Sequence, residues 1–382
     1  MRKHAFWLAL AVSVCGMAAD SDLPRGQIID DVQCEGDASQ HYSLYLPSNF
    51  TPLRRWPVIL AFDAGGRGRR AVERYQAAAE KYGYIVAGSN NSRNGPWEIS
   101  LGAADAMTAD VGKRFPVDSK RTYTAGMSGG ARVAMLLALN SDSIAGVFAS
   151  SAGFPDGFHQ SVRFPIFGSA GTDDFNNWEM HQLDRGVKSP HRVEVFEGGH
   201  TWLPSELATD GVEWMEIQAM KSGLRPRDQK LIDEIFARRM AQAETKRSRL
   251  EKMRELKSIA VDFEGFEDVA KVSEGAAALE RLQDVKDGLN AERSEEERER
   301  RITAEVYQLR NELTLPSSDV FAKLKERVIQ LLEQSKAAED SPTRRIARRV
   351  LTGLSVSSRG IGHPEFQELL NQIRPPGQGG RQ

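Results

Sequence analysis

Residues 121–130 read RTYTAGMSGG and hold the pattern Gly-x-Ser-x-Gly, with Ser128 at its centre. The pattern is common by chance, but here a β-prone run leads into it and a helical pattern over 131–139 follows it. A strand that turns sharply into a helix places a serine hydroxyl at the helix N-terminus, and the flanking glycines permit the turn. We therefore predict that Ser128 is a nucleophile and that the backbone N–H of Gly129 helps to hold an oxyanion. The alternative is a glycine-rich turn without function.

The segment around this turn, residues 41–222, alternates β-rich runs with amphipathic helical stretches, which is typical of an α/β domain. Strands are predicted at 41–46, 58–63, 84–89, 121–127, 144–150, 164–170 and 192–197, and helices at about 71–82, 102–115, 129–140, 175–186 and 205–221. Continuous apolar runs such as 58–62 indicate parallel strands that are covered on both faces. Only about a dozen residues separate Ser150 from Phe164. We predict a mostly parallel, doubly wound sheet of the α/β-hydrolase type without a large lid.

The second part of the chain has a different composition. Residues 225–382 carry 58 charged side chains, whereas all six tryptophans lie before them. Helical spacing recurs through this part, including one long stretch over 276–313. We predict an α/β domain over 20–223, a separate all-α domain over 224–374 that docks on the first domain or on a partner, and a disordered tail over 375–382.

Charge and terminal composition exclude some classes of partner and indicate export. The 51 Lys and Arg residues against 53 Asp and Glu give a net charge of −2, so no nucleic-acid partner is expected. Residues 1–19 combine a basic head, a short apolar core and small residues at the end, which is typical of a secretory signal peptide. We predict a periplasmic or secreted protein with no membrane span after cleavage near Ala19. Cys34 then remains as the only cysteine, so no intramolecular disulfide can form.

A serine hydroxyl needs a base to become nucleophilic. The candidate base is His200, which follows two glycines directly after the last predicted strand. The acid that orients it should follow the preceding strand, where Asp173 and Asp174 are adjacent. We prefer Asp174 and expect the other carboxylate to cap the next helix. The order Ser128, Asp174, His200 is the order found in α/β-hydrolases.

A second oxyanion donor is predicted in the loop after the strand 58–63, which reads AGGRGRR over 64–70. Gly65 is the preferred donor and Gly66 is the next choice, because glycines leave backbone N–H groups accessible. Arg67 is a candidate for binding an acidic group of the substrate. A solvated surface arginine is the simpler interpretation.

Two tryptophans are candidates for contact with the substrate. Trp97 ends a loop at 90–97 that should form one wall of the site, and Trp202 follows His200 closely. Each indole could stack on an aromatic or sugar ring, or could equally be a packing residue.

With these residues assembled, the segment from about 41 to 221 resembles the α/β-hydrolase superfamily, and within it the secreted poly(3-hydroxybutyrate) depolymerase and feruloyl esterase group. The resemblance lies in three stretches, GMSGG at 126–130, GTDD at 171–174 and GHTW at 199–202. It implies a nucleophile, an orienting acid and an acid–base at Ser128, Asp174 and His200, and its Gly-Thr-x-Asp spacing also favours Asp174. The chain has Asp63-Ala64 where the group usually has His-Gly.

The sequence thus predicts an exported serine hydrolase that cleaves carboxylic esters through an acyl-enzyme on Ser128. The expected substrate is a small-molecule or polymer-attached ester. No cofactor and no metal site is predicted, because no His-Glu-x-x-His, paired Cys-x-x-Cys or phosphate-binding glycine motif occurs. Two alternatives remain: a peptidase on the same fold, and a helical interaction or scaffold protein that carries a degenerate hydrolase domain.

Overall fold

A computed structural model describes residues 23–313, 318–358 and 361–373, so the predicted signal peptide and tail lie outside the described residues. Its centre is an eight-stranded sheet with the order β1-β2-β4-β3-β5-β6-β7-β8. The strands are β1 (Ile28–Gln33), β2 (His41–Tyr45), β3 (Trp56–Asp63), β4 (Ile85–Ser89), β5 (Val117–Met127), β6 (Ile144–Ser150), β7 (Ile166–Gly171) and β8 (His191–Phe196). The pairs β1–β2 and β2–β4 are antiparallel and the other neighbouring pairs are parallel. This confirms the predicted α/β-hydrolase type of sheet.

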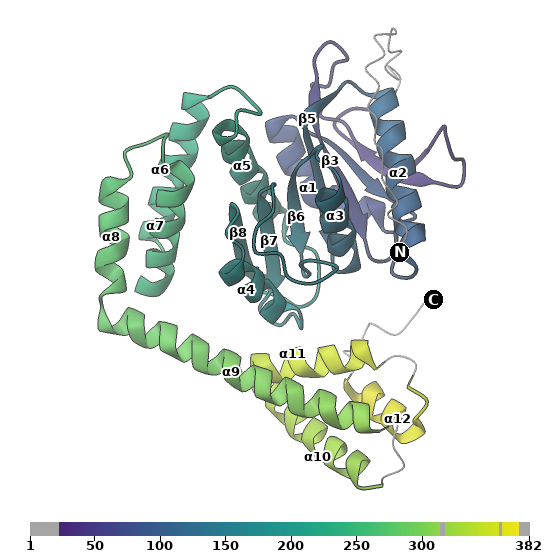
Figure 1. The fold of residues 1–382 in the computed structure, drawn as a ribbon, viewed down its shortest axis with the longest axis vertical. Helices are drawn as coiled ribbons and strands as arrows, with labels where there is room; N and C mark the ends of the chain where they lie inside the picture. The colour runs from purple at the N-terminus through teal and green to yellow at the C-terminus, as the bar shows by residue number, and fades with distance from the viewer. Residues whose placement is uncertain (1–22, 314–317, 359–360, 374–382) are drawn as a thin grey trace.

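Helices cover both faces of the sheet (Figure 1). They are α1 (Gly68–Tyr82), α2 (Trp97–Arg114), α3 (Gly129–Asn140), α4 (Asn177–Gly186) and α5 (Ser205–Lys221). Alternate residues of β3 face opposite layers: Leu60 packs in the core shared with α2, α3 and α4, whereas Ile59 packs in the core shared with α1 and α5. Every residue of β3 is buried, as the continuous apolar run predicts.

The sequence reasoning missed the strand β1. Its residues read IIDDVQ, and the two adjacent aspartates hide the alternation that marks a strand. Pairing with β2 overrides that local pattern, and the register shifts between Ile29 and Val32 as the aspartates are passed.

The chain beyond α5 is helical. It forms α6 (Gln229–Glu244), α7 (Arg249–Phe263), α8 (Ala270–Glu280), α9 (Gln283–Glu312), α10 (Ser318–Ser335), α11 (Pro342–Ser357) and α12 (Pro364–Ile373). The long helical stretch predicted over 276–313 is divided between two helices, because Leu282 adopts an extended conformation (φ −67°, ψ 144°) between α8 and α9. Val272 and Ala276 of α8 pack with α7, and the turn at Leu282 frees α9 to run in a new direction. None of the described helices is both long and apolar enough to cross a bilayer.

The helical region has two cores. Helices α6, α7 and α8 share one with Ile217 and Met220 of α5, and α9 to α12 enclose the other around residues such as Val306 and Leu354. Figure 1 shows α9 leading from the first cluster to the second, so that α11 lies below the sheet. The 30 residues of α9 span about 45 Å.

A buried ionic network attaches the first cluster to strand β8. Arg239 of α6 donates to Glu255 (2.9 Å) and Asp262 (2.5 Å) of α7, and Arg192 of β8 lies within 4.0 Å of both carboxylates. Trp214 of α5 donates its indole N–H to Asp262 (2.7 Å). Burial alone raises the pKa of Glu255, but Arg239 and Arg192 lower that pKa more, so the carboxyl stays ionised. The edge strand that precedes His200 is therefore held by helices from outside the α/β domain.

Candidate active site

Ser128 occupies a strained turn between β5 and α3. Its φ is 56° and its ψ is −121°, a conformation that residues other than glycine rarely adopt. The turn is held because the Ser128 N–H donates to the carbonyl of Ser150 at 2.8 Å. A Cβ on Gly126 would collide with the carbonyl of Gly130, and a Cβ on Gly130 would collide with that of Phe62 in β3. No side chain therefore fits at either glycine of the motif, Gly126 or Gly130.

Three predicted residues come together at this turn. His200 Nδ1 lies 2.8 Å from Asp174 Oδ1, and His200 Nε2 lies 2.9 Å from Ser128 Oγ. The Asp174 side chain is fully buried, while that of His200 is 19% exposed. With Nδ1–H donating to Asp174, Nε2 carries a lone pair that can accept the proton of Ser128.

The two adjacent aspartates have different partners. Asp174 Oδ1 accepts from His200 and also from the backbone N–H of Asn176 (2.8 Å). Asp173 instead accepts from Arg348 of α11 at 2.9 Å. The expectation that Asp173 caps α4 is therefore wrong, because Asn176 holds the N-cap position and Asp173 points toward α11.

The loops that carry Asp174 and His200 are bonded to each other. Thr172 donates its backbone N–H to Phe196 O (2.9 Å), and Asp173 donates to Gly198 O (2.8 Å). A Cβ on Gly171 would collide with the carbonyl of Gly198. This close approach explains why position 171 is a glycine, and the two backbone bonds place the acid beside the histidine.

The structure overturns the prediction that Gly65 is an oxyanion donor. The Gly65 N–H donates to Asp63 Oδ1 at 2.8 Å, so it is already engaged. Its neighbour Ala64 lies beside Gly129, since Cβ atoms at the two positions would be 3.6 Å apart. The runner-up, Gly66, donates to the backbone carbonyl of Asp63 at 3.3 Å.

Asp63 also determines the positions of the Arg67 and Trp202 side chains. Its fully buried carboxylate accepts from Arg67 Nε (2.7 Å) and from Trp202 Nε1 (2.7 Å). Trp202 is only 3% exposed and packs edge-on against Tyr75. Neither predicted substrate contact fits these positions: Trp202 is a packing residue, and the charge of Arg67 neutralises a buried carboxylate.

The loop over 90–96 after β4, predicted to form a wall of the site, lies against the loop that follows β3. Asn94 donates its backbone N–H to Ala64 O (2.9 Å). A Cβ on Gly129 would collide with Asn94 Oδ1, so this side chain lies against the predicted oxyanion donor. Trp97 begins α2 and is 42% exposed, which leaves its ring accessible to a ligand.

Phe175 is a site residue that the sequence reasoning missed. Its ring lies 4.2 Å from that of His200, centroid to centroid, with 33° between the planes. The available signal was its position directly after Asp174, but a phenylalanine at a helix start is more often a core residue.

Cys34 lies apart from the candidate active site in a hydrophobic core. It is 2% exposed, and burial together with the charge of Asp110 raises the pKa of its thiol to about 11. The thiol is therefore protonated at neutral pH and acts as a packing group. In the described ranges, no three His, Cys, Asp or Glu side chains are grouped to hold a metal ion.

The sheet order, the serine turn after β5, the acid after β7 and the histidine after β8 together define an α/β-hydrolase fold. No protein-family model matches the chain, and no curated protein matches its sequence.

Solved structures show similarity over about half of the chain. An esterase from Pyrobaculum calidifontis is 13% identical, with coverage of 52% of this chain and 87% of that one and a TM-score of 0.40. An S-formylglutathione hydrolase from Agrobacterium tumefaciens is 16% identical, with coverage of 49% of this chain and 93% of that one and a TM-score of 0.40. A ferulic acid esterase is 18% identical over 50% and 96%, with a TM-score of 0.39.

The packing of the serine turn predicts the effect of a single methyl group. Gly130→Ala should lower the free energy of unfolding by about 1–3 kcal/mol, because the new Cβ meets a backbone carbonyl that cannot move freely. Gly112→Ala is the control: it adds the same methyl group at an exposed position of α2 with nothing within 4 Å, and should stabilise by roughly 0.5–1 kcal/mol. Urea unfolding of both variants measures this, and a Gly130→Ala protein as stable as the control would contradict the packing.

Trp202→Phe tests whether Trp202 is a packing residue. The variant keeps an aromatic ring but leaves one buried lone pair of Asp63 without its indole donor, so the free energy of unfolding should fall by roughly 1–3 kcal/mol. The KM for an aromatic ester should not change, because the side chain is buried away from ligands. Thermal unfolding and steady-state kinetics check the two parts, and a raised KM at unchanged stability would restore Trp202 as a substrate contact.

Proposed function

We propose that the protein is a serine hydrolase that cleaves carboxylic esters. The observation that carries the proposal is the continuous hydrogen-bonded series from buried Asp174 through His200 to Ser128, at a strained turn that holds the hydroxyl. This arrangement supplies an orienting acid, a base and a nucleophile within hydrogen-bonding distance of one another.

Catalysis would proceed in two halves on these groups. Ser128 Oγ attacks the ester carbonyl while His200 Nε2 takes its proton, and Asp174 stabilises the imidazolium. The tetrahedral intermediate collapses as His200 returns the proton to the leaving alcohol, which leaves an acyl group on Ser128. Water then gives a proton to His200 and attacks the acyl carbonyl, and the acid departs as the proton returns to Ser128.

The oxyanion hole is proposed to consist of the N–H groups of Gly129 and Ala64. Gly129 lies at the N-terminus of α3, where the helix dipole favours negative charge. Ala64 takes the place of the predicted Gly65, whose N–H is bound to Asp63. Asn94 fixes this loop by its hydrogen bond to the Ala64 carbonyl.

A soluble or polymer-attached ester is the proposed substrate. The connection between β6 and β7, residues 151–165, contains no helix that could form a lid. Ser128 and His200 are both partly exposed, which supports an open site. Trp97 is proposed to contact an aromatic or sugar ring of the substrate because its side chain is accessible on the neighbouring loop.

Export is proposed from the composition of residues 1–19 alone, with cleavage near Ala19. The N-terminal sequence of the protein recovered from the periplasm or the medium tests it. Mature chains that still begin at Met1 would contradict export by cleavage.

Covalent labelling tests the proposed activity directly. A fluorophosphonate should add to the folded protein once, at Ser128, and His200→Ala should abolish the adduct because the hydroxyl is then not activated. Ser128→Ala should lower ester turnover by about 10⁴-fold or more. Intact mass, peptide mapping and parallel assays on aryl esters and chromogenic peptides give the readout. Full esterase activity in Ser128→Ala would overturn the assignment, and peptide cleavage without ester preference would favour the peptidase.

A further inference from the structure

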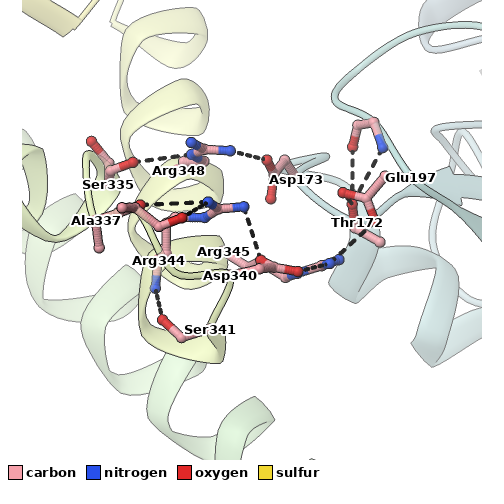
Figure 2. Close-up of polar contacts among 12 residues, drawn as sticks. Thr172, Asp173, Glu197, Ser335, Ala337, Asp340, Ser341, Arg344, Arg345 and Arg348 are labelled. Carbon is pink, nitrogen blue, oxygen red and sulfur yellow. Dashed lines mark hydrogen bonds and ion pairs between the residues drawn. The ribbon is translucent and has the colours of Figure 1, made fainter.

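Helix α11 of the C-terminal helical region contacts the loop that carries the candidate acid. Arg348 Nη1 donates to Asp173 Oδ2 at 2.9 Å, as Figure 2 shows, and Arg349 Nη1 donates to the backbone carbonyl of Thr172 at 2.6 Å. These two acceptors directly precede Asp174 in the chain. We propose that α11 is a positioning element of the active site, which holds Asp174 and His200 in the geometry that Ser128 requires. The proposal rests on the proposed function.

Arg349 is itself held rigidly. Its Nε and Nη2 donate to the two carboxylate oxygens of Glu299 on α9, at 2.7 and 2.5 Å. The side chains are 12% and 10% exposed, so this bidentate pair is little screened by solvent. Because Glu299 fixes Nε and Nη2 of the planar guanidinium, Nη1 is held in the single orientation in which it reaches the Thr172 carbonyl. The carbonyl of Thr172 is thus tied to α9 through Arg349.

The same helix also reaches the loop that carries the histidine. Arg345 pairs with Glu197 at 3.1 Å and also with Asp340, which precedes α11. Figure 2 shows Arg345 and Asp340 between α11 and the α/β domain. Glu197 is 74% exposed, so this pair contributes little by itself. The loop is held mainly through the backbone N–H groups of Thr172 and Asp173, which donate to Phe196 O at the end of β8 and to Gly198 O after it. A shift of one loop therefore shifts the other.

An apolar contact supports the imidazole ring from its face. Phe175 lies against His200, and it also lies beside Gly353 of α11, where an added Cβ would be 3.3 Å from Phe175 Cβ. The same Cβ would be 3.0 Å from the hydroxyl of Tyr307 on α9. The absence of a side chain at Gly353 lets α11 approach Phe175 this closely. His200 is thereby fixed at one edge by Asp174 and on one face by Phe175.

A displacement of about 1 Å in catalytic groups can lower a rate by about 100-fold, so loss of these contacts should appear in kcat. These contacts do not touch the substrate, so the binding of a small substrate before the reaction should not depend on them. KM should therefore remain near its wild-type value. A role limited to folding would instead lower the fraction of active protein and leave turnover per active site unchanged.

The experiment uses the full chain and two independent perturbations. The double variant Arg349→Met/Glu299→Leu removes the Thr172 contact without leaving a buried charge unpaired, and Gly353→Ala inserts one methyl group against Phe175. Arg344→Met is the matched control, because the Arg344 hydrogen bonds run to residues 337, 338 and 340 within the helical region. Each variant is titrated with a fluorophosphonate and assayed on a small aryl ester. Amide hydrogen exchange is followed at Thr172 and Asp173.

We expect turnover per labelled site to fall about 10- to 100-fold in both test variants, while KM stays unchanged. Amide exchange at Thr172 and Asp173 should become faster in both. The control Arg344→Met should keep the wild-type turnover and exchange rates. Turnover per labelled site that stays at the wild-type value in both folded test variants would overturn the proposal. So would an equal loss in Arg344→Met. A wild-type protein that neither labels nor hydrolyses esters would refute the proposed function instead, and the exchange rates would then report the positioning of the loop alone.

Discussion

The close approach of α3 to the central strands is the constraint on which the site depends. Gly130 lies so near the Phe62 carbonyl of β3 that no side chain fits between them, and the turn before it forces Ser128 to a φ of 56°. Such a conformation persists only where the surrounding structure over-determines it. It places the hydroxyl at the carboxyl edge of a parallel sheet, the edge where β7 and β8 also end. Asp174 and His200 therefore need only short loops to reach it.

The helical region contacts the α/β domain near both ends of strand β8. At the start of the strand, Arg192 meets the carboxylates of α7, and after its end Glu197 meets α11. An edge strand is ordinarily the least restrained part of a sheet. Here it leads directly into His200, whose position relative to Ser128 must be held closely. The 30-residue α9 links the two contacts, so the helical region is joined to the α/β domain both at the start of β8 and at the loops that follow β7 and β8.

The parts of the site that could be predicted were those with a local signal. Ser128, Asp174 and His200 each follow a strand and lie near glycines, and close backbone contacts leave no room for a side chain at Gly126, Gly130 and Gly171. No local pattern could reveal that Arg349 bonds to Thr172, because 177 residues separate them. The fold class followed from alternating apolar runs. The break between α8 and α9 could not be predicted in this way. Helical periodicity in the sequence continues through that turn, which is set by the packing of α8 on α7.

The three site residues that were placed wrongly, Gly65, Trp202 and Arg67, share one cause. Asp63 stands at the end of β3, where the resembling group usually has histidine, and its carboxylate is fully buried. A buried negative charge requires donors, and it takes them from Gly65, Trp202 and Arg67. The first donor is thereby lost to the oxyanion hole and the second to substrate binding. Arg67 also offsets a charge that would otherwise oppose an oxyanion close by. Because Asp63 engages the Gly65 N–H, Ala64 is left as the proposed second oxyanion donor, and the paired Arg67 becomes part of the support of this loop.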